Sequence, residues 1–177
     1  MELDQVLFKK LFVFFEKWNG KNSEEELSRT IHLKDISSRL TLIARALTGE
    51  NIDIFPAETE GGWKGQIFYL PTSFSLLPTI EENLNFYIFR IAYLSIQSGE
   101  GLNWEAKDTP PSVEESREKA QTIAPLVLQK MEEEYPPVAA FYQTIEERFP
   151  EEEGSSFWLY GKYMSNRDVF ENGNGTA

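Results

Sequence analysis

The feature that most constrains the fold is an apolar pattern over residues 79–98 that covers two sides of one predicted helix. Thr79 and Glu82 form a capping box at its start, and Gly99 follows its end. At about 100° per residue, the apolar side chains fall into two stripes on nearly opposite faces. The first stripe contains Ile80, Leu84, Tyr87, Ile88, Ile91 and Leu94, and the second contains Phe86, Phe89, Tyr93 and Ile96. Such a helix needs cover on both sides, so we expect a central helix wrapped by several others.

The rest of the chain supplies helices that can cover it. A Ser112–Glu115 capping box starts one of them, and Tyr135-Pro136-Pro137 separates it from the next. Apolar periodicity predicts helices over residues 3–18, 24–31, 35–48, 112–134 and 138–149, with a short one in the aromatic stretch 157–163. The predicted fold class is therefore mainly α, a helical bundle around residues 79–98.

A change of period indicates a small β element between two of the predicted helices. Ile52 and Ile54 alternate with Asp53, and residues 66–70 are short, aromatic and β-prone. Glu60-Gly61-Gly62 between them is a turn signal. We predict a β-hairpin over residues 51–70 with Trp63 at or near its tip.

The length and composition favour one domain with a real core. We expect a single helical domain over residues 1–165 and a polar tail over 166–177 that links to a downstream region. The formal charge of −12, more acidic after residue 100, would repel nucleic acid and anionic membranes, so neither is an expected partner.

The residue types present exclude several kinds of site. There is no cysteine and a single histidine, His32, so neither a thiolate metal site nor a multi-histidine zinc site can form within the chain. Residues 35–39 resemble the metal-adhesion pattern Asp-x-Ser-x-Ser but end in Arg39 instead of serine. We therefore predict no catalytic set, no metal and no cofactor. The lack of cysteine and of a secretion leader favours a cytoplasmic protein.

Polar side chains on the central helix allow two interpretations. Arg90 lies in a polar seam between the two stripes, and a buried arginine needs an ion pair with a glutamate or hydrogen bonds to carbonyl groups. Alternatively, Arg90, Tyr87, Tyr93 and His32 could line a polar pocket beside the helix. That pocket would serve a small-ligand-binding or hydrolytic domain.

Tryptophans and acidic segments are the candidate contact surfaces for a protein partner. Trp63 lies in the predicted hairpin, Trp104 in the predicted loop over residues 100–111, and Trp158 in the aromatic stretch. The acidic carboxy-terminal half offers a charged surface for a basic partner. A homo-oligomer in which residues 157–163 pack against a second copy is a further hypothesis.

The order of several motifs resembles a known family. Arg39-Leu40 and Ala44-x-Ala46-Leu47-x-Gly49 precede a predicted strand, Leu70-Pro71 ends a second strand, and Phe89-Arg90-Ile91-Ala92 lies within the long helix. Over about residues 35–100, this order resembles the amino-terminal region of the NorD/CbbO family, whose members are accessory factors for nitric oxide reductase or Rubisco. In that family the helical region precedes a von Willebrand A domain, and the protein works with a MoxR-class AAA+ ATPase.

The resemblance implies a non-enzymatic adaptor or recognition domain. Such a domain would bind the ATPase or its target enzyme and help the ATPase to activate or remodel that enzyme. The chain differs from the family in having no von Willebrand A pattern, and in Phe89 and Ser95, where the family tends to have tyrosine and histidine. No metal or catalytic role of that histidine is therefore carried over.

Overall fold

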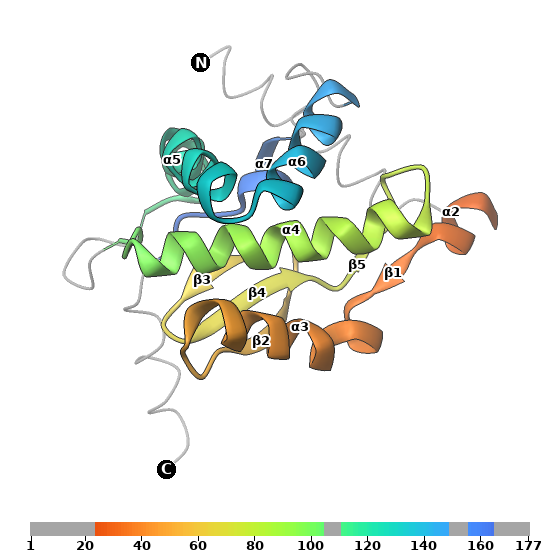
Figure 1. Ribbon diagram of the computed structural model, residues 1–177, viewed down its shortest axis with the longest axis horizontal. Coiled ribbons are helices and arrows are strands. Elements are labelled where there is room, and N and C mark those ends of the chain that lie inside the picture. Colours follow the sequence, from red (N-terminus) through yellow and green to blue (C-terminus); the bar gives the residue numbers. More distant parts are fainter. Residues whose placement is uncertain (1–23, 105–110, 149–155, 165–177) are drawn as a thin grey trace.

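Helix α4 (Ile80–Gly99) runs through the middle of the molecule, and the other elements lie on its two sides (Figure 1). The computed structural model describes residues 24–104, 111–148 and 156–164. Within these ranges the chain forms six helices and five strands, so it is mainly helical with a small β portion. The predicted helix over residues 3–18 and the predicted tail over 166–177 lie outside the described residues.

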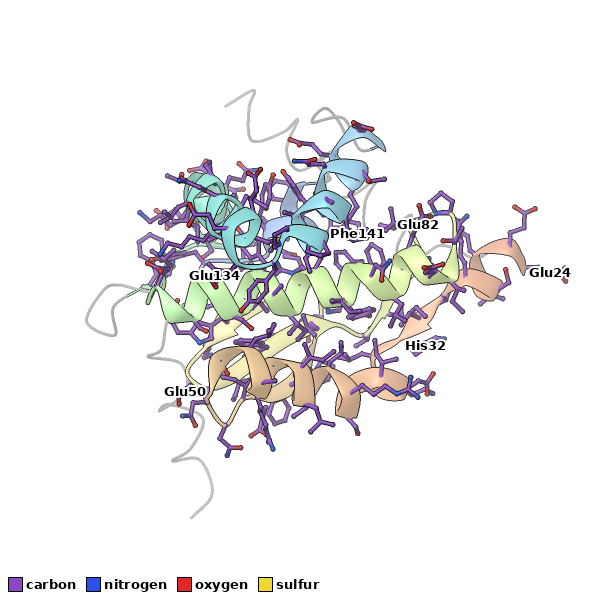
Figure 2. The ribbon with its side chains drawn as sticks, viewed as in Figure 1. Glu24, His32, Glu50, Glu82, Glu134 and Phe141 are labelled. Carbon is purple, nitrogen blue, oxygen red and sulfur yellow. The ribbon has the colours of Figure 1, made fainter. Side chains whose placement is uncertain are left out.

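Both predicted stripes of α4 contribute to the core. The amide of Glu82 donates to the Thr79 hydroxyl at 3.1 Å, and the Thr79 amide donates to the Glu82 carboxylate at 3.1 Å, as the capping box predicts. Tyr87 from the first stripe and Phe89 from the second are fully buried, although Ile80 in the first turn is exposed. Figure 2 shows side chains filling the layers on both sides of the helix. The prediction of a helix buried on two sides is confirmed.

Three helices cover one side of α4, namely α5 (Val113–Glu134), α6 (Pro136–Arg148) and α7 (Ser156–Tyr160) (Figure 1). The predicted capping box at the start of α5 is present, with the Glu115 amide donating to the Ser112 hydroxyl. The break between α5 and α6 lies at Tyr135, which leaves the helical conformation. None of the described helices is both long and apolar enough to cross a bilayer.

The other side of α4 is covered by helix α3 (Leu33–Thr48) and β-strands, with the short helix α2 (Glu24–Arg29) at the end (Figure 1). The predicted mainly α fold with a β element at its side is therefore confirmed in outline, although the sheets form a larger part of this side than the predicted hairpin. Helix α3 begins at Leu33, before the predicted start at residue 35, because the Leu33 amide is already satisfied by the Thr72 carbonyl at 2.9 Å.

The predicted hairpin over residues 51–70 is wrong in its pairing. Strand β4 (Ile67–Pro71) lies between β2 (Asp53–Ala57) and β3 (Gly62–Lys64). Strand β2 is parallel to β4, and only β3 and β4 form an antiparallel hairpin, through a turn at residues 65–66. A second small sheet pairs β1 (Ile31–His32) with β5 (Ser73–Phe74), the continuation of β4.

Gly61 explains the difference between the predicted and the observed strand pairing. To reach β3 from β2, the chain passes across β4, and Gly61 lies at this crossing with φ 71°. A Cβ atom at Gly61 would lie 2.0 Å from the Tyr69 carbonyl oxygen, so no other residue fits there. The Glu60-Gly61-Gly62 signal therefore marks a crossover between two strands that do not pair with each other.

Candidate functional site

Arg90 is one of the four residues predicted to line a polar pocket, and its side chain is fully buried. Its Nη1 donates to the Leu159 carbonyl at 2.6 Å, and its guanidinium carbon lies 5.2 Å from the ring centre of Tyr93. Nε and Nη2 have no hydrogen-bond partner among the described protein atoms. Burial lowers the pKa of Arg90 to about 10, although the negative charge of Glu60 acts to raise it. The expectation that Arg90 bonds a carbonyl group is confirmed.

A buried ion pair lies beside Arg90. Arg117 donates to Glu60 through Nε at 2.6 Å and through Nη2 at 3.1 Å, and both side chains are almost completely buried. The guanidinium of Arg117 also lies 5.1 Å from the ring centre of Phe157. Burial opposes ionisation of Glu60, but the hydrogen bond and charge of Arg117 hold its pKa below the ordinary value. One carboxylate thus supports two buried guanidinium groups.

The segment from α7 to residue 164 closes this region. The Lys162 amide donates to the Gly61 carbonyl at 2.8 Å, and the Tyr163 amide donates to the Ser116 carbonyl at 3.1 Å. Gly161 has φ 71°, and a Cβ atom there would lie 2.4 Å from Nη2 of Arg90. The backbone of this segment therefore lies directly on the guanidinium.

The four predicted pocket residues do not form one open site. Tyr87 and Tyr93 are fully buried, like Arg90, and burial raises the pKa of both phenols. The Tyr87 hydroxyl donates to the Pro71 carbonyl at 2.7 Å, which holds the ring against β4. His32 is exposed at the start of α3, on the other side of α4 from α5 (Figure 2). Three members thus belong to the core, and the histidine is separate from them.

The three predicted contact tryptophans are also largely inside the molecule. Trp63 is buried, and its indole donates to the Gly65 carbonyl at 2.6 Å. Trp158 is buried edge-on against Phe74, with ring centres 4.5 Å apart. Trp104 is half-buried and packs edge-on against Tyr163 at 5.1 Å. Residues 105–110 of its loop lie outside the described residues, and these three rings offer a partner little surface.

In the described part of the carboxy-terminal half, helix α5 has an exposed polar surface. Its basic side chains are engaged elsewhere, since Arg117 pairs with Glu60, Lys130 pairs with Glu100, and Lys119 lies over the ring of Trp104. The exposed carboxylates on α5 are those of Glu114, Glu115, Glu118, Glu132, Glu133 and Glu134. We call these six residues the α5 acidic face.

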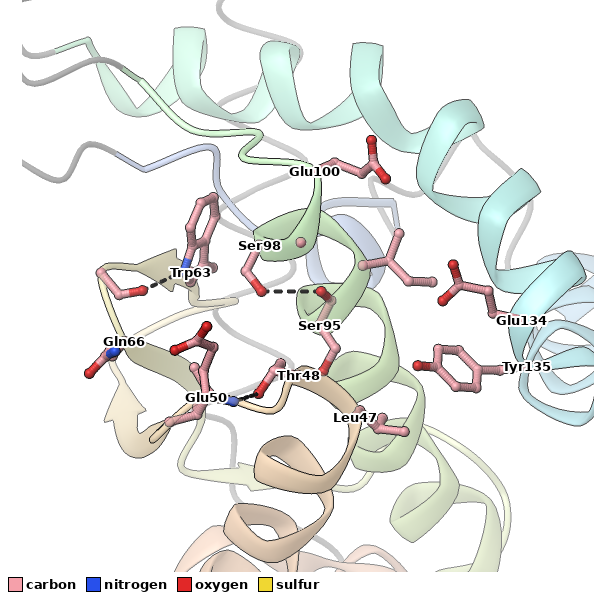
Figure 3. Close-up of a pocket in the computed structure, with 14 residues that line it drawn as sticks. Leu47, Thr48, Glu50, Trp63, Gln66, Ser95, Ser98, Glu100, Glu134 and Tyr135 are labelled. Atoms are coloured by element: carbon pink, nitrogen blue, oxygen red, sulfur yellow. Dashed lines mark hydrogen bonds between the residues drawn. The ribbon is translucent and has the colours of Figure 1, made fainter.

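Open cavities lie at the two ends of α3. One, of about 460 Å³, is lined by His32, Lys34, Ile54 and Pro56, among others. The other, of about 490 Å³, lies at the carboxyl ends of α3, α4 and α5 (Figure 3). Arg90 lines neither of them.

Sequence reasoning missed Glu60, Arg117 and the second cavity. The sequence places Glu60 in a turn signal and does not single out Arg117, because neither residue carries a local pattern that marks its partner. The position of Arg90 in the predicted central helix indicated a carboxylate nearby, since a buried arginine needs a compensating charge or hydrogen bonds. Comparison with known proteins adds no assignment: no protein-family model, no curated protein and no solved structure matches this chain.

Proposed function

We propose that this chain is the adaptor or recognition domain of a NorD-like accessory protein. It would bind a MoxR-class AAA+ ATPase or the target enzyme and help the ATPase to activate or remodel that enzyme. The proposal of this family rests on the sequence resemblance over residues 35–100. The proposal of a docking role rests on the distribution of polar groups in the structure.

The single observation that carries the docking role is the α5 acidic face. The polar side chains that could have lined a reactive pocket, Arg90, Tyr87 and Tyr93, are fully buried in the core. The six carboxylates of α5, by contrast, are exposed and outnumber the three basic side chains of the helix, of which Arg117 and Lys130 pair with glutamates outside it. Such a surface attracts a basic patch on another protein and speeds their association.

The alternative of a ligand pocket at Arg90 is less well supported. A substrate could reach the guanidinium only by displacing Leu159 and Gly161, which lie on it. That displacement would also remove the cover from Trp158 and its aromatic neighbours.

The test is a binding measurement with the purified chain and the MoxR-class ATPase from the same genome. We expect binding that weakens about tenfold between about 50 and 500 mM sodium chloride, because screening shortens the reach of surface charge. Reversing two charges of the α5 acidic face, with Glu118→Lys and Glu133→Lys, should weaken binding by a similar factor.

The matched control reverses two exposed charges on α2, with Glu24→Lys and Glu25→Lys, and should bind like the unchanged chain. Failure to bind either the ATPase or its target enzyme at low salt would refute the adaptor function. Equal weakening by the α2 and α5 variants would refute the α5 acidic face as the contact surface.

A further inference from the structure

The cavity at the carboxyl ends of three helices has a floor and a rim of different chemistry. Its floor contains the buried side chains of Ile52, Trp63 and Ile96, with Tyr135 half-buried at one side. Its rim contains the exposed residues Glu50, Glu100 and Glu134. Figure 3 shows Glu50 and Trp63 on one side of the carboxyl end of α4, Glu134 and Tyr135 on the other, and Glu100 at the end of the helix. The volume of about 490 Å³ is within the range of small-molecule sites.

The helix ends make this cavity electronegative. Glu50 follows α3, Glu100 follows α4, and Glu134 ends α5, so the three carboxylates accompany three helix carboxyl termini. Each helix carboxyl terminus carries a partial negative charge and favours a cation. The last turns of α4 and α5 contain no basic residue, and Arg45 in the last turn of α3 turns to the Ile52 carbonyl and Asp53.

One basic side chain does reach the rim. Lys130 pairs with Glu100. The charge of Lys130 also acts on Glu134, but the rim has three carboxylates and one ammonium group, together with the three helix ends, so it keeps a net negative charge. Its carboxylates are separated, and within the described ranges no three histidine or acidic side chains lie close enough together to hold a metal ion. A larger organic cation fits this spacing better than a metal ion does.

We propose that this cavity binds an alkylammonium cation. The methylene chain lies on the floor formed by Trp63 and Ile96, and the ammonium group lies between Glu50 and Glu134. The same chemistry is present in a free aliphatic diamine and in the lysine side chain of a protein partner. The inference rests on the cavity and goes beyond the adaptor function, which concerns the α5 acidic face.

The experiment titrates the purified chain with two probes, free cadaverine and lysine capped at its amino and carboxyl groups, and follows amide and indole NMR signals. At about 20 mM sodium chloride, where surface charge is weakly screened, we expect saturable shifts at Gly65, Ser98 and the Trp63 indole. Glu50→Gln and Glu134→Gln should each weaken binding about threefold, and together about tenfold, as expected for partly exposed ion pairs.

Glu118→Gln is the matched control, because it makes the same change on α5 away from the cavity. It should leave the affinity for both probes unchanged. Glu118→Gln and Glu50→Gln together separate the two proposals, since Glu118 belongs only to the surface proposed to bind the ATPase and Glu50 only to the cavity, whereas Glu134 belongs to both. Binding of capped lysine as tight as that of cadaverine supports a partner's side chain as the ligand, and binding of cadaverine alone supports a free amine.

Three outcomes would overturn the inference. Pentanol has the same carbon chain without the charge. If it bound as tightly as cadaverine, the cavity would bind apolar chains without selecting a cation. Equal weakening by Glu118→Gln and Glu134→Gln would show non-specific attraction to an acidic protein. Absence of shifts at Gly65, Ser98 and Trp63 up to saturating probe would show that the cavity does not take this cation.

Discussion

The fully buried polar side chains of helix α4 include Asn83 near its start and Arg90 in its middle, and the surroundings of these two residues differ. The Asn83 amide oxygen accepts from the Leu77 amide at 2.9 Å, and its nitrogen donates to the Arg29 carbonyl at 2.9 Å and the Leu77 carbonyl at 3.1 Å. Arg90 makes one hydrogen bond, to Leu159, and leaves Nε and Nη2 without a partner among the described protein atoms.

The difference follows from what each group needs. A neutral amide can be satisfied by a few backbone groups, and three such groups converge on Asn83 where α2 and the β5–α4 connection meet. A guanidinium has five donors and a charge, and burying that charge costs several kcal/mol unless it is compensated. Around Arg90 the compensation comes from one carbonyl, the ring of Tyr93 and the charge of Glu60. Asn83 should therefore stabilise the fold, whereas Arg90 should contribute little on balance.

The largest effect is expected at Glu60, the carboxylate that supports Arg117 directly and Arg90 through its charge. Glu60→Gln should lower the free energy of unfolding by about 3–5 kcal/mol, because it leaves buried guanidinium charge without compensation. Urea denaturation measures the change, with exposed Glu58→Gln as the matched control. A loss below about 1 kcal/mol would show that the ion pair is not what stabilises the region around Arg90.

Asn83→Ala should have the next largest effect. It removes three hydrogen bonds and leaves the Leu77 and Arg29 backbone groups without their partner, which should cost about 2–3 kcal/mol. Half-buried Asn85, on the same helix, is the control, and Asn85→Ala should change stability by less than about 0.5 kcal/mol. If the two variants were equally stable, water would have replaced the hydrogen bonds of Asn83. Asn83 would then contribute as little to stability as is expected of Arg90.

Acid should reproduce part of the Glu60 effect without a mutation. The pKa of Glu60 is lowered from 4.5 in the folded state, so below that pH the unfolded chain binds the proton more readily. The stability that Glu60 provides is therefore complete above pH 4.5 and is lost as the pH falls through its lower folded value. Urea denaturation of the unchanged chain and of Glu60→Gln should converge as the pH falls. If the difference in free energy of unfolding between the unchanged chain and Glu60→Gln stayed constant with pH, the ionised form of Glu60 would not be the stabilising one.

Local features and long-range contacts of this fold differ in how far the sequence could predict them. The stripes and capping boxes of α4 and α5 are local patterns, and the structure confirms them. The Glu60–Arg117 pair joins residues 57 positions apart, and no spacing along the chain marks it. The parallel pairing of β2 with β4 was missed for the same reason, since Gly61 signals a turn but not where the next strand goes. Burial of Trp63 and Trp158 likewise depends on packing between distant segments.

Arg90→Met should have the smallest effect and tests the contrast most directly. The variant leaves the Leu159 carbonyl without its donor and removes the contact of the guanidinium with the Tyr93 ring. It also removes the cost of burying a charge with incomplete hydrogen bonding, and methionine fills a similar volume. These contributions oppose each other, so the free energy of unfolding should change by less than about 1 kcal/mol, with exposed Arg39→Met as control. A loss above about 3 kcal/mol would mean that the partners of Arg90 outweigh its burial cost, and that Asn83 and Arg90 stabilise α4 to a comparable degree.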